Sequence, residues 1–542
     1  MKKYLVVIVF LLALILRVWK ITEYPAGLNA DEAAIGYNAY SLLKTGKDEF
    51  GHSWPMTFQS FNDFKPGIYF YLVLPFVKLL GLNELAVRLP SVILGTITVL
   101  ILYLLVKELF DSESLAISSM LLLTISPWHL HFSRGGWETN TATFFIVTGT
   151  YFLMKALKAP KFYFLSSLFY LLSLYTYHSA RVIVPLLIFG LVILYRKEIL
   201  RKSNFRWIFL TIGVGVFLTL PLVFSFLGSA GVSRFSGVGI FADTGPIWRV
   251  NELRGQHQNP YSLSSKLLHN KVFAYEIAIL ENYFSHFSGD FLFINGDEIQ
   301  RNKIPEMGQL YLIEIVFLPL GIYFFLKNRP KNWEVPFIWL AVAPIASSLT
   351  FQSPHALRAL NMVIPIMIIN SYGLVNLLSW VRSKLTIILS SLFIILFFLF
   401  YFWSLTDYLH QYYVHYPQRY PAAWEYGFKE LVNYIKSNEK KYTKIYVTNK
   451  YDQPYILFAF YLQYPPEKFQ EEAKLTPRDK YGFSTVDNFD KYYFGPIDWQ
   501  AIKSQNKTLV VGSPEEIPQD ARVVAKFFFK DGLTEAFRIA EL

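Results

Sequence analysis

The sequence predicts a polytopic α-helical membrane protein with about eleven spans, additional re-entrant or interfacial helices, and a small external α/β domain at the C-terminal end. Of its 542 residues, 53% are hydrophobic, 18% are aromatic and only 17% are charged, which is rare in soluble globular proteins. The apolar residues come in runs of roughly 17 to 25, the length that crosses the hydrocarbon core of a bilayer. From about residue 407 these runs give way to short alternating segments.

Eleven apolar segments have the character of membrane spans. They are residues 4–18, 87–106, 114–132, 139–157, 162–178, 182–195, 207–228, 308–326, 334–351, 359–380 and 385–406. A further apolar segment, GIYFYLVLPFVKLLG at 67–81, is short and contains Pro75 and Lys78. We expect it to form an interfacial or re-entrant helix that does not cross the membrane.

The distribution of basic residues sets the predicted topology. If 67–81 does not cross, the basic clusters fall in cytoplasmic loops, as the positive-inside rule requires, whereas a crossing there would move the later ones outside. These clusters are Lys2/Lys3, Lys107, Lys155/Lys158/Lys161, Arg196/Lys197/Arg201/Lys202/Arg206, Lys327/Arg329/Lys331 and Arg382/Lys384. We therefore expect a cytoplasmic N-terminus, a first outer loop at about 19–86 and a large outer loop at about 229–306. The predicted domains are a catalytic membrane domain over 1–406 and an external domain over 407–542.

Charge and cysteine content exclude several classes of function. The net charge of +11 follows from the topology and does not indicate a nucleic-acid partner. The absence of cysteine excludes disulfides, thiolate metal ligands and a cysteine nucleophile. The first twenty residues also resemble a signal peptide, but no convincing cleavage site follows them. We expect a multi-pass protein of a bacterial or archaeal cell membrane.

The external domain is predicted from alternation and turn signals. YTKIYVTN at 442–449 and NKTLVVGS at 506–513 are typical of strands, and PAAWEYGFKELVNYIKSNEKK at 421–441 of an amphipathic helix. ARVVAKFFFKDG followed by LTEAFRIAEL, at 521–542, predicts a closing hairpin with an Asp-Gly turn.

The stretch NADEAAIGYNAYSLLKTG at 29–46 opens a helix with two adjacent carboxylates. Asn29 is placed to cap this helix, and Glu32 stands three residues on, where it can close a capping box. The simplest interpretation of both acids is therefore stabilisation of the helix start. Asp31 is not needed for the box, and the helix dipole favours a charged carboxylate in the first turn. Asp31 and Glu32 are the candidate catalytic residues, and Asp31 is the better suited to accept a proton.

Single arginines near the predicted outer ends of helices form a second signal. They are Arg17, Arg88, Arg134, Arg181 and Arg358. Charged groups at membrane depth are costly and usually face an interior cavity. Guanidinium groups suit a phosphate held at headgroup depth, because they bind it bidentately and stay charged. The alternative for any one of them is snorkelling or pairing with a local acid.

Two further outer stretches carry polar residues. FNDFKPGIYFY places Asp63 and Lys65 just before the short helix, where an ordinary polar turn is the alternative. PWHLHFSRGGWETN places His131, Glu138 and Asn140, together with an arginine, across a helix–helix corner, although Glu138 also suits a simple helix start. Transfer of a sugar from a polyprenyl phosphate needs a base for the acceptor hydroxyl and cations for the departing phosphate, and this membrane face gathers both.

In this order and topology the residues resemble GT-C glycosyltransferases. The resemblance rests on the Asp-Glu pair, a Lys-Pro before a short helix, ELAVRLPS opening the next span, and SR followed by a Glu beyond it. The chain is most similar to protein O-mannosyltransferases and lipid A aminoarabinose transferases, over roughly residues 1–400 and most strongly over 20–140. The resemblance implies an inverting transferase that uses a polyprenyl-phosphate-linked sugar.

The resemblance also implies roles for individual residues. Asp31 matches the catalytic base, Lys65 a position near the donor phosphate or a metal, and Glu138, with Asp63, a second acid or an acceptor or metal ligand. Where aminoarabinose transferases carry a phosphate-binding lysine after the fifth span, this chain has YTYHSARVIVP, so His178 or Arg181 would replace it. This departure leaves the donor and a divalent metal cofactor open. Arg134 and Arg358 complete the candidate donor-phosphate residues.

The sequence is also compatible with three different functions. A lipid-sugar flippase would need polar residues through the whole depth of the bundle, whereas the charges here gather at its outer end. A non-catalytic assembly protein is the second of these functions, and a pyrophosphate-donor ligase or polymerase is the third. The sequence identifies neither the sugar that is transferred nor the acceptor. The acceptor is a protein, a glycan or a lipid.

The large outer loop contains NYFSHFSGDFLFINGDEIQR at 282–301. Its aromatic and amphipathic character predicts a helix over the active cavity, in the manner of a lid for the acceptor. His286 and Asp290 are spaced to share one face and to bind a metal, although a solvated polar face is the simpler interpretation.

Overall fold

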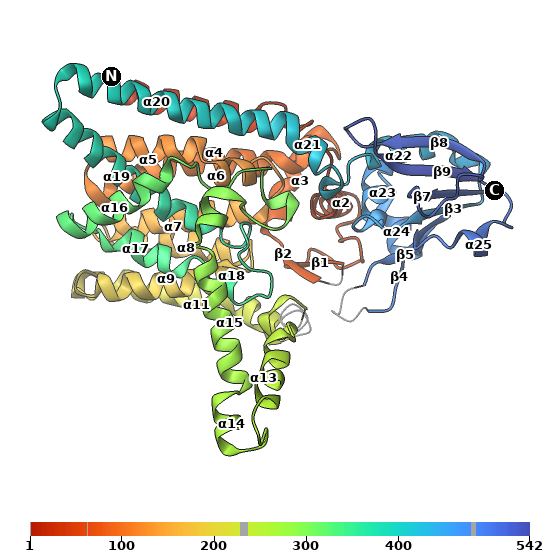
Figure 1. Ribbon diagram of the computed structural model, residues 1–542, viewed down its shortest axis with the longest axis horizontal. Coiled ribbons are helices and arrows are strands. Elements are labelled where there is room, and N and C mark those ends of the chain that lie inside the picture. The colour runs from red at the N-terminus through yellow and green to blue at the C-terminus, as the bar shows by residue number, and fades with distance from the viewer. Residues whose placement is uncertain (1, 62, 228–236, 479–483) are drawn as a thin grey trace. The chain divides into compact units, whose positions relative to one another are not determined.

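The computed structural model describes residues 2–61, 63–227, 237–478 and 484–542 (Figure 1). The chain forms two compact units. The helical unit contains Met1–Ala13, Gly95–Phe132 and Thr139–Tyr408, and the sheet unit contains Leu14–Leu94, Ser133–Glu138 and Leu409–Leu542. The first outer loop thus belongs to the same unit as the C-terminal sheet. The domain boundary at 406 stays a prediction.

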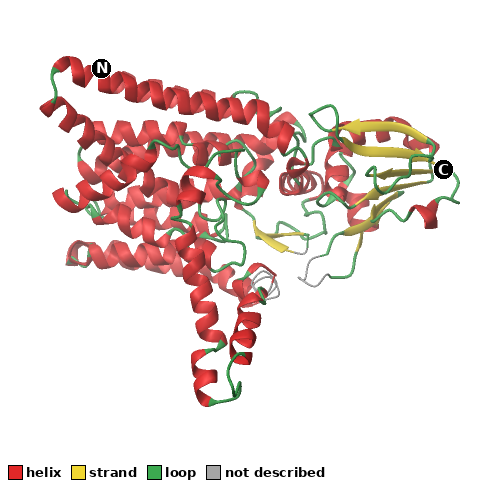
Figure 2. Cartoon of the chain, viewed as in Figure 1, coloured by secondary structure: helices red, strands yellow, loops and turns green. Residues whose placement is uncertain are grey.

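The helical unit is built from helices of very different lengths (Figure 2). They include α5 (Glu113–Ile125), α6 (Pro127–Phe132), α7 (Glu138–Ala156), α8 (Phe162–Leu174), α9 (Ala180–Leu194), α10 (Arg196–Ile199), α11 (Phe205–Leu227), α13 (Gly245–Gly255), α14 (Leu263–Leu268), α15 (Lys271–Ser285), α16 (Glu314–Asn328), α17 (Glu334–Val342), α18 (Ile345–Ser348), α19 (Val363–Lys384) and α20 (Ile387–His410). Helices α1 (Lys2–Val18) and α4 (Glu84–Phe110) each run from one unit into the other.

Each of the eleven predicted spans is helical along most of its length, and two are interrupted. Ser126 separates α5 from α6, and a short break separates α17 from α18. Within the described residues, four helices are long and apolar enough to cross a membrane: Glu84–Phe110, Lys202–Phe224, Leu360–Lys384 and Ile387–Arg419. The number of eleven crossings is therefore not confirmed, because several of the other apolar helices are shorter than a span. The segment at 67–81 is the short helix α3 (Ile68–Leu80), as predicted.

Close helix packing in the helical unit depends on glycine. A methyl group at Gly321 of α16 would lie 2.0 Å from the carbonyl oxygen of Ile369 on α19, and one at Gly373 would lie 2.4 Å from that of Phe317. The two backbones approach so closely that only hydrogen fits between them. This is the usual way in which helices pack inside a membrane, where small residues bring backbones together.

The sheet unit combines a short hairpin with a larger mixed sheet. Its helices are α2 (Ala30–Thr45), α3, α21 (Tyr416–Arg419), α22 (Phe428–Asn438), α23 (Pro454–Leu462), α24 (Pro466–Glu472) and α25 (Trp499–Ile502). Strands β1 (Thr57–Ser60) and β2 (Asp63–Pro66) form the hairpin, and the sheet contains β3 (Lys444–Thr448), β4 (Lys474–Leu475), β5 (Val486–Phe489), β6 (Tyr492–Gly495), β7 (Thr508–Gly512), β8 (Val523–Phe528) and β9 (Glu535–Glu541).

The strand order of the sheet is β4-β5-β6-β3-β7-β9-β8. Strand β3 pairs in parallel with both β6 and β7, and the outer pairs are antiparallel. The predicted strands β3 and β7, the helix α22 and the closing hairpin β8–β9 are confirmed. Alternate residues of β7 enter different cores, with Leu509 and Val511 on one face and Val510 on the other.

Helix α2 lies inside the core of the sheet unit. Its Ala33, Ala34 and Ile35 are fully buried in the same hydrophobic cluster as Tyr455 and Phe458 of α23 and the inner face of the sheet. A methyl group at Gly36 would lie 2.5 Å from the ring of Phe460, so glycine permits this approach of α23. The helix that carries Asp31 and Glu32 is therefore packed as a core element of the C-terminal α/β fold.

A buried carboxyl group also joins α2 to this fold. The Asn38 amide of α2 donates to Glu49 Oε1 at 3.0 Å and accepts from the Glu49 backbone at 2.9 Å. The Tyr455 hydroxyl of α23 faces the same carboxyl group. Burial raises the pKa of Glu49 from 4.5 to about 8, although the Asn38 hydrogen bond and the charge of Lys65 act in the opposite direction, while Asp48 adds to the rise.

This pKa shift predicts how stability depends on pH. Between pH 4.5 and about 8 the unfolded chain loses the Glu49 proton while the folded protein keeps it, so the free energy of unfolding falls as the pH rises through this window. We expect the Glu49→Gln variant to remove this part of the slope and to melt several degrees higher than the unsubstituted protein near pH 8. Thermal unfolding in detergent at pH 5 and pH 8 measures this difference in melting temperature.

The exposed Glu471→Gln variant on α24 is the matched control, and its melting temperature should follow that of the unsubstituted protein at both pH values. Parallel pH profiles for the Glu49→Gln variant and the unsubstituted protein would contradict the assignment.

Candidate active site

The candidate site begins at the first turn of α2. The Asn29 side chain accepts the Glu32 backbone N–H at 3.0 Å, so the predicted N-cap is confirmed. In the predicted capping box the Glu32 carboxylate would bind back to the Asn29 backbone. In the structure that carboxylate is bound instead by Arg88 and by the backbone N–H of Gly136. The two adjacent acids consequently face different surroundings, with Glu32 fully buried and Asp31 about 30% exposed.

Glu32 forms a buried ion pair with Arg88 of α4. The guanidinium group donates to both carboxylate oxygens, from Nε at 2.9 Å and from Nη2 at 3.0 Å. The backbone N–H of Gly136 adds a third bond to Glu32 Oε1 at 2.7 Å. A buried ion pair of this kind is tolerable only when nearly all of its donors and acceptors are satisfied.

The remaining donors of Arg88 hold the chain that precedes α2. Its Nη1 donates to the carbonyls of Ile21 at 2.9 Å and Pro25 at 3.2 Å, and its Nη2 donates to Gly27 at 2.5 Å. With the two bonds to Glu32, all five N–H groups of the guanidinium are used. Arg88 therefore fixes both the entry to α2 and its first turn.

Asp31 is paired with Lys65, a residue that lies 34 positions further along the chain. Lys65 stands on β2 opposite Phe58 of β1, and its ammonium group lies 5.2 Å from the centre of the Phe61 ring. Lys65 is about 12% exposed, so the pair lies at the edge of the core with Asp31 reaching further toward solvent. Asp63 begins the same strand. The structure thus brings together two residues that the sequence marked separately.

Gly136 and Arg134 lie in the corner between α6 and α7 and belong to the sheet unit. Arg134 is buried, and it donates to the carbonyls of Leu16 at 2.6 Å and Trp19 at 2.7 Å at the end of α1. Its guanidinium group also stacks over Tyr412 at 5.0 Å. Since cations stabilise helix C-termini, this geometry is that of a cap for α1.

The neighbouring candidates at this corner are also enclosed. Glu138 opens α7 and is only 9% exposed, and Asn140 is fully buried in the first turn of the same helix. His131 of α6 belongs to the helical unit, where its Nε2 donates to the Arg301 carbonyl at 2.8 Å.

Three predicted phosphate ligands belong to the helical unit. Arg358 lines a small cavity together with Tyr177, Ser179 and Asn361, so it meets the turn between α8 and α9. Arg181 lies 3.2 Å from His178 Nδ1 within that turn and donates from Nε to the Leu174 carbonyl. Arg358 also donates to Thr350 Oγ1 at 2.7 Å. The structure therefore brings Arg358 close to the segment that contains His178 and Arg181.

The predicted helix at 282–301 is confirmed only in part, because α15 ends at Ser285 and only short helical turns follow, at Asp290–Ile294 and Gln300–Asn302. His286 donates from Nδ1 to the Asn282 carbonyl at 2.8 Å, and its Nε2 lies 2.8 Å from Ser347 Oγ. Burial lowers the pKa of His286 to about 4, so the ring is neutral and both nitrogens are engaged by protein. Among the described residues, no group of three or more His, Asp or Glu side chains is placed to hold a metal.

Sequence reasoning missed Asp297 in the same loop. The Asp297 carboxylate is buried, accepts the Ala356 backbone N–H at 2.6 Å and lies 3.6 Å from His355 Nδ1. It also accepts from Asn302 at 3.0 Å. Asp297 thus holds the turn that leads to Arg358. Its only sequence signal was a Gly-Asp-Glu turn, which does not reveal a partner 59 residues away.

The fold of this chain, with its helical unit and C-terminal sheet, is similar to the folds of two solved GT-C glycosyltransferases. ArnT from Cupriavidus metallidurans bound to undecaprenyl phosphate matches with a TM-score of 0.51 at 11% identity, over 99% of this chain and 97% of that chain. The oligosaccharyltransferase AglB from Archaeoglobus fulgidus, in complex with an inhibitory peptide and a dolichol-phosphate, matches with a TM-score of 0.52 at 14% identity. That match covers 85% of this chain and 63% of AglB.

Part of the sequence also matches one particular family. Residues 65–224, which run from β2 into α11, match the family model of dolichyl-phosphate-mannose-protein mannosyltransferases. No curated protein matches the chain. The predicted resemblance to GT-C glycosyltransferases is confirmed by these findings.

The Arg88–Glu32 pair predicts a large loss of stability when either partner changes. We expect Arg88→Lys to lower the free energy of unfolding by about 3–5 kcal/mol, because an ammonium group cannot replace five directed donors and leaves Glu32 buried with unsatisfied oxygens. Arg522→Lys is the matched control, since Arg522 is exposed in a surface pair with Glu541 and should change stability by less than about 1 kcal/mol. Equal melting temperatures for the two variants would show that the buried pair does not support α2.

Proposed function

We propose that this protein is an inverting glycosyltransferase that moves a sugar from a polyprenyl-phosphate donor to an acceptor hydroxyl at the outer face of the membrane. The observation that carries the proposal is the Asp31–Lys65 pair at the start of α2. A carboxylate and an ammonium group stand side by side at a partly exposed edge, while the neighbouring Glu32 is committed to Arg88. Asp31 is therefore the acid of the two that can reach a substrate.

Asp31 acts as the general base in the proposed mechanism. Its carboxylate takes the proton of the acceptor hydroxyl as that oxygen attacks the anomeric carbon from the side opposite the phosphate. The new glycosidic C–O bond forms while the bond from the anomeric carbon to the phosphate oxygen breaks, and the electron pair leaves with the phosphate. The anomeric configuration inverts because a single displacement occurs.

Lys65 is suited to contact both the proposed base Asp31 and the phosphate group of the donor. An ammonium group has three N–H donors and a positive charge, so its chemistry suits contact with both a carboxylate and a phosphate oxygen. Positive charge next to the leaving phosphate stabilises the transition state, where negative charge builds up on that group. Arg358, with His178 and Arg181 beside it, is a second candidate set for the phosphate.

The neighbouring charged residues take structural roles in this proposal. We propose that Glu32 positions α2 and does not react, since its carboxylate is bound by Arg88 and Gly136. We likewise propose that Arg134 is a structural cap. Glu138 and Asp63 stay candidates for a second acid or for an acceptor or metal contact.

The relatives support a lipid-linked donor. ArnT was solved with undecaprenyl phosphate and AglB with a dolichol-phosphate and a peptide. The family matched over 65–224 is described by its use of dolichyl-phosphate mannose. We propose a polyprenyl-phosphate sugar as the donor and a protein, glycan or lipid as the acceptor, with the site outside the cell as the basic loops predict.

The base assignment predicts that Asp31→Asn lowers kcat by a factor of at least about 100, because the amide cannot accept the acceptor proton. The substitution keeps the size of the side chain, so expression and melting temperature should change little. Transfer by the purified protein, followed by mass spectrometry over a panel of polyprenyl-phosphate sugars, measures the effect. Near-normal turnover by the Asn variant would remove Asp31 as the base.

The matched control for that experiment is Glu23→Gln, an exposed acid of the same outer loop that forms a surface pair with Lys20. It should transfer sugar at the rate of the unsubstituted protein. Movement of intact lipid-linked sugar without any covalent product would instead favour a flippase, and consumption of pyrophosphate-linked donors alone would favour a ligase.

The phosphate assignment predicts weaker donor binding. Lys65→Met and Arg358→Ala should each raise the Kd of the donor by a factor of at least about 10, the loss of one charge-assisted contact. Arg329→Ala is the matched control, because Arg329 is exposed and follows the end of α16. Calorimetry with the polyprenyl phosphate alone measures binding without turnover. Unchanged affinity in both variants would exclude the two candidate sets.

A further inference from the structure

The segment from α13 to α15 forms a helical hairpin that leaves the bundle of the helical unit. In the view of Figure 1, α13 and α15 run crosswise to α9, α5 and α19. The hairpin, defined here as residues 245–285, includes the short helix α14 at its tip. Its direction across the bundle is the direction of the membrane plane, because spanning helices run close to the membrane normal.

The base of the hairpin is fixed at the end of α18. Residues 239 and 350 form an antiparallel bridge, and the Asn282 amide of α15 donates to the carbonyls of Ser348 at 3.3 Å and Thr350 at 3.0 Å. The Tyr283 hydroxyl donates to the Ala341 carbonyl of α17 at 2.9 Å. Both ends of the hairpin therefore lie close to the end of the α17–α18 segment. In the predicted topology this is the outer boundary of the membrane.

One side of α15 carries a stripe of exposed apolar side chains. Phe273, Ile277, Leu280 and Phe284 follow each other at intervals of four, three and four residues, so they share one face of the helix. They are exposed by 55%, 48%, 55% and 64%. Exposed rows of this length are unusual in contact with water and mark a surface that is normally covered.

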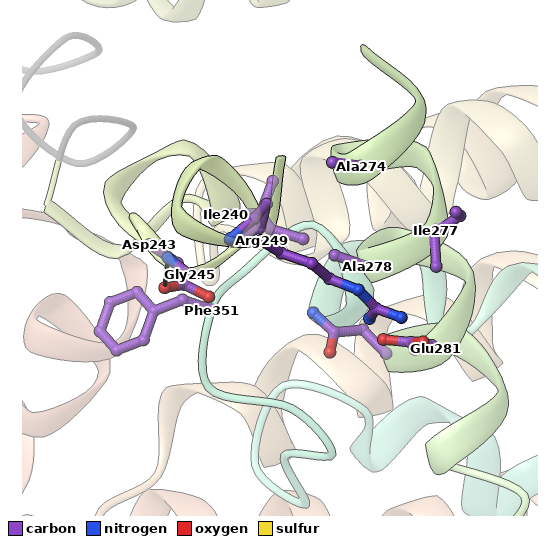
Figure 3. A pocket seen from close by; sticks show the side chains of 11 residues that line it. Ile240, Asp243, Gly245, Arg249, Ala274, Ile277, Ala278, Glu281 and Phe351 are labelled. Carbon is purple, nitrogen blue, oxygen red and sulfur yellow. Dashed lines mark hydrogen bonds between the residues drawn. The ribbon is translucent and has the colours of Figure 1, made fainter. Parts of the chain in front are cut away.

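A cavity with a mixed polar and apolar lining separates the two long helices of the hairpin. A cavity of about 240 Å³ lies between α13 and α15, and its lining includes Asp243, Arg249, Glu281 and Asn282. Figure 3 shows the Arg249 side chain extending from α13 toward Glu281 of α15.

The tip adds positive charge to the apolar surface. Between Arg254 and Lys271 the sequence contains Lys266 and no acidic residue, which gives the tip three basic residues against none. Four large apolar side chains there are highly exposed: Tyr261, Leu263, Leu267 and Leu268. Exposed Leu and Tyr beside Lys and Arg are the composition of helices that lie in a membrane interface containing anionic lipids.

We propose that the 245–285 hairpin lies flat in the outer leaflet of the bilayer, with the α15 stripe in the acyl boundary and the basic tip on anionic headgroups. The lipid bilayer is the occupant that the observations favour over a second copy or a partner protein, because the apolar stripe, the basic tip and the crosswise direction all agree with it. The proposal does not use the catalytic assignment of Asp31, so either can fail alone.

The absence of cysteine permits a clean test, because each introduced cysteine is the single labelling site. The full-length Leu280→Cys and Leu267→Cys variants are labelled with a fluorophore and placed, one copy per disc, in nanodiscs of phosphatidylethanolamine and phosphatidylglycerol. Quenching by doxyl-labelled lipid and by aqueous iodide is then compared. Ser437→Cys on the exposed face of α22 is the water-accessible control.

We expect lipid quenching several-fold stronger at positions 280 and 267 than at 437, with iodide quenching in the reverse order. Replacing phosphatidylglycerol by phosphatidylcholine should weaken lipid quenching at 267 more than at 280, since the tip carries the charge. Phe273→Cys repeats the test on the stripe if the Leu280 variant folds poorly. Iodide quenching at the stripe equal to that at 437 would overturn the proposal, as would protection that appears only when several copies share a vesicle.

Discussion

The buried guanidinium of Arg88 is the constraint on which the candidate site depends. Its five N–H groups join the chain before α2, through Ile21, Pro25 and Gly27, to the Glu32 carboxylate in the first turn. Gly136 adds a bond from the α6–α7 corner. Because a buried charge left without its partners is very costly, these segments have one stable arrangement, and Asp31 is presented by that arrangement.

Two adjacent acids consequently take different roles. Glu32 points into the core and is neutralised by Arg88, whereas Asp31 remains at the edge beside Lys65. The C-terminal sheet supports the same turn from the other side, since α23 packs against α2 within a single hydrophobic cluster. The C-terminal fold is thus a structural part of the candidate site.

Local patterns in the sequence predicted the helices and strands better than they predicted which residues contact each other. Asn29 capping, the helices of the apolar segments, and the β3, β7 and β8–β9 strands follow from periodicity and turn residues, and all are present. The pairing of Glu32 with Arg88 spans 56 residues, and Arg134 meets backbone carbonyls more than a hundred residues away. Such contacts have no local signature, so the sequence could not show that the Glu32 carboxylate binds Arg88 or that Arg134 binds the end of α1. Helix α23 was missed because a fully apolar helix in an α/β fold has no amphipathic period.

We propose that Arg88 and Glu32 together hold Asp31 where it meets the sugar. A structure of the protein with a bound, non-transferable polyprenyl-phosphate sugar and its acceptor is the decisive experiment. We expect the Asp31 carboxylate within about 3 Å of the acceptor hydroxyl, on the side of the anomeric carbon opposite the phosphate, with Glu32 still bound to Arg88. A sugar whose anomeric carbon faces another carboxylate, with Asp31 still bound to Lys65 and turned away, would contradict it.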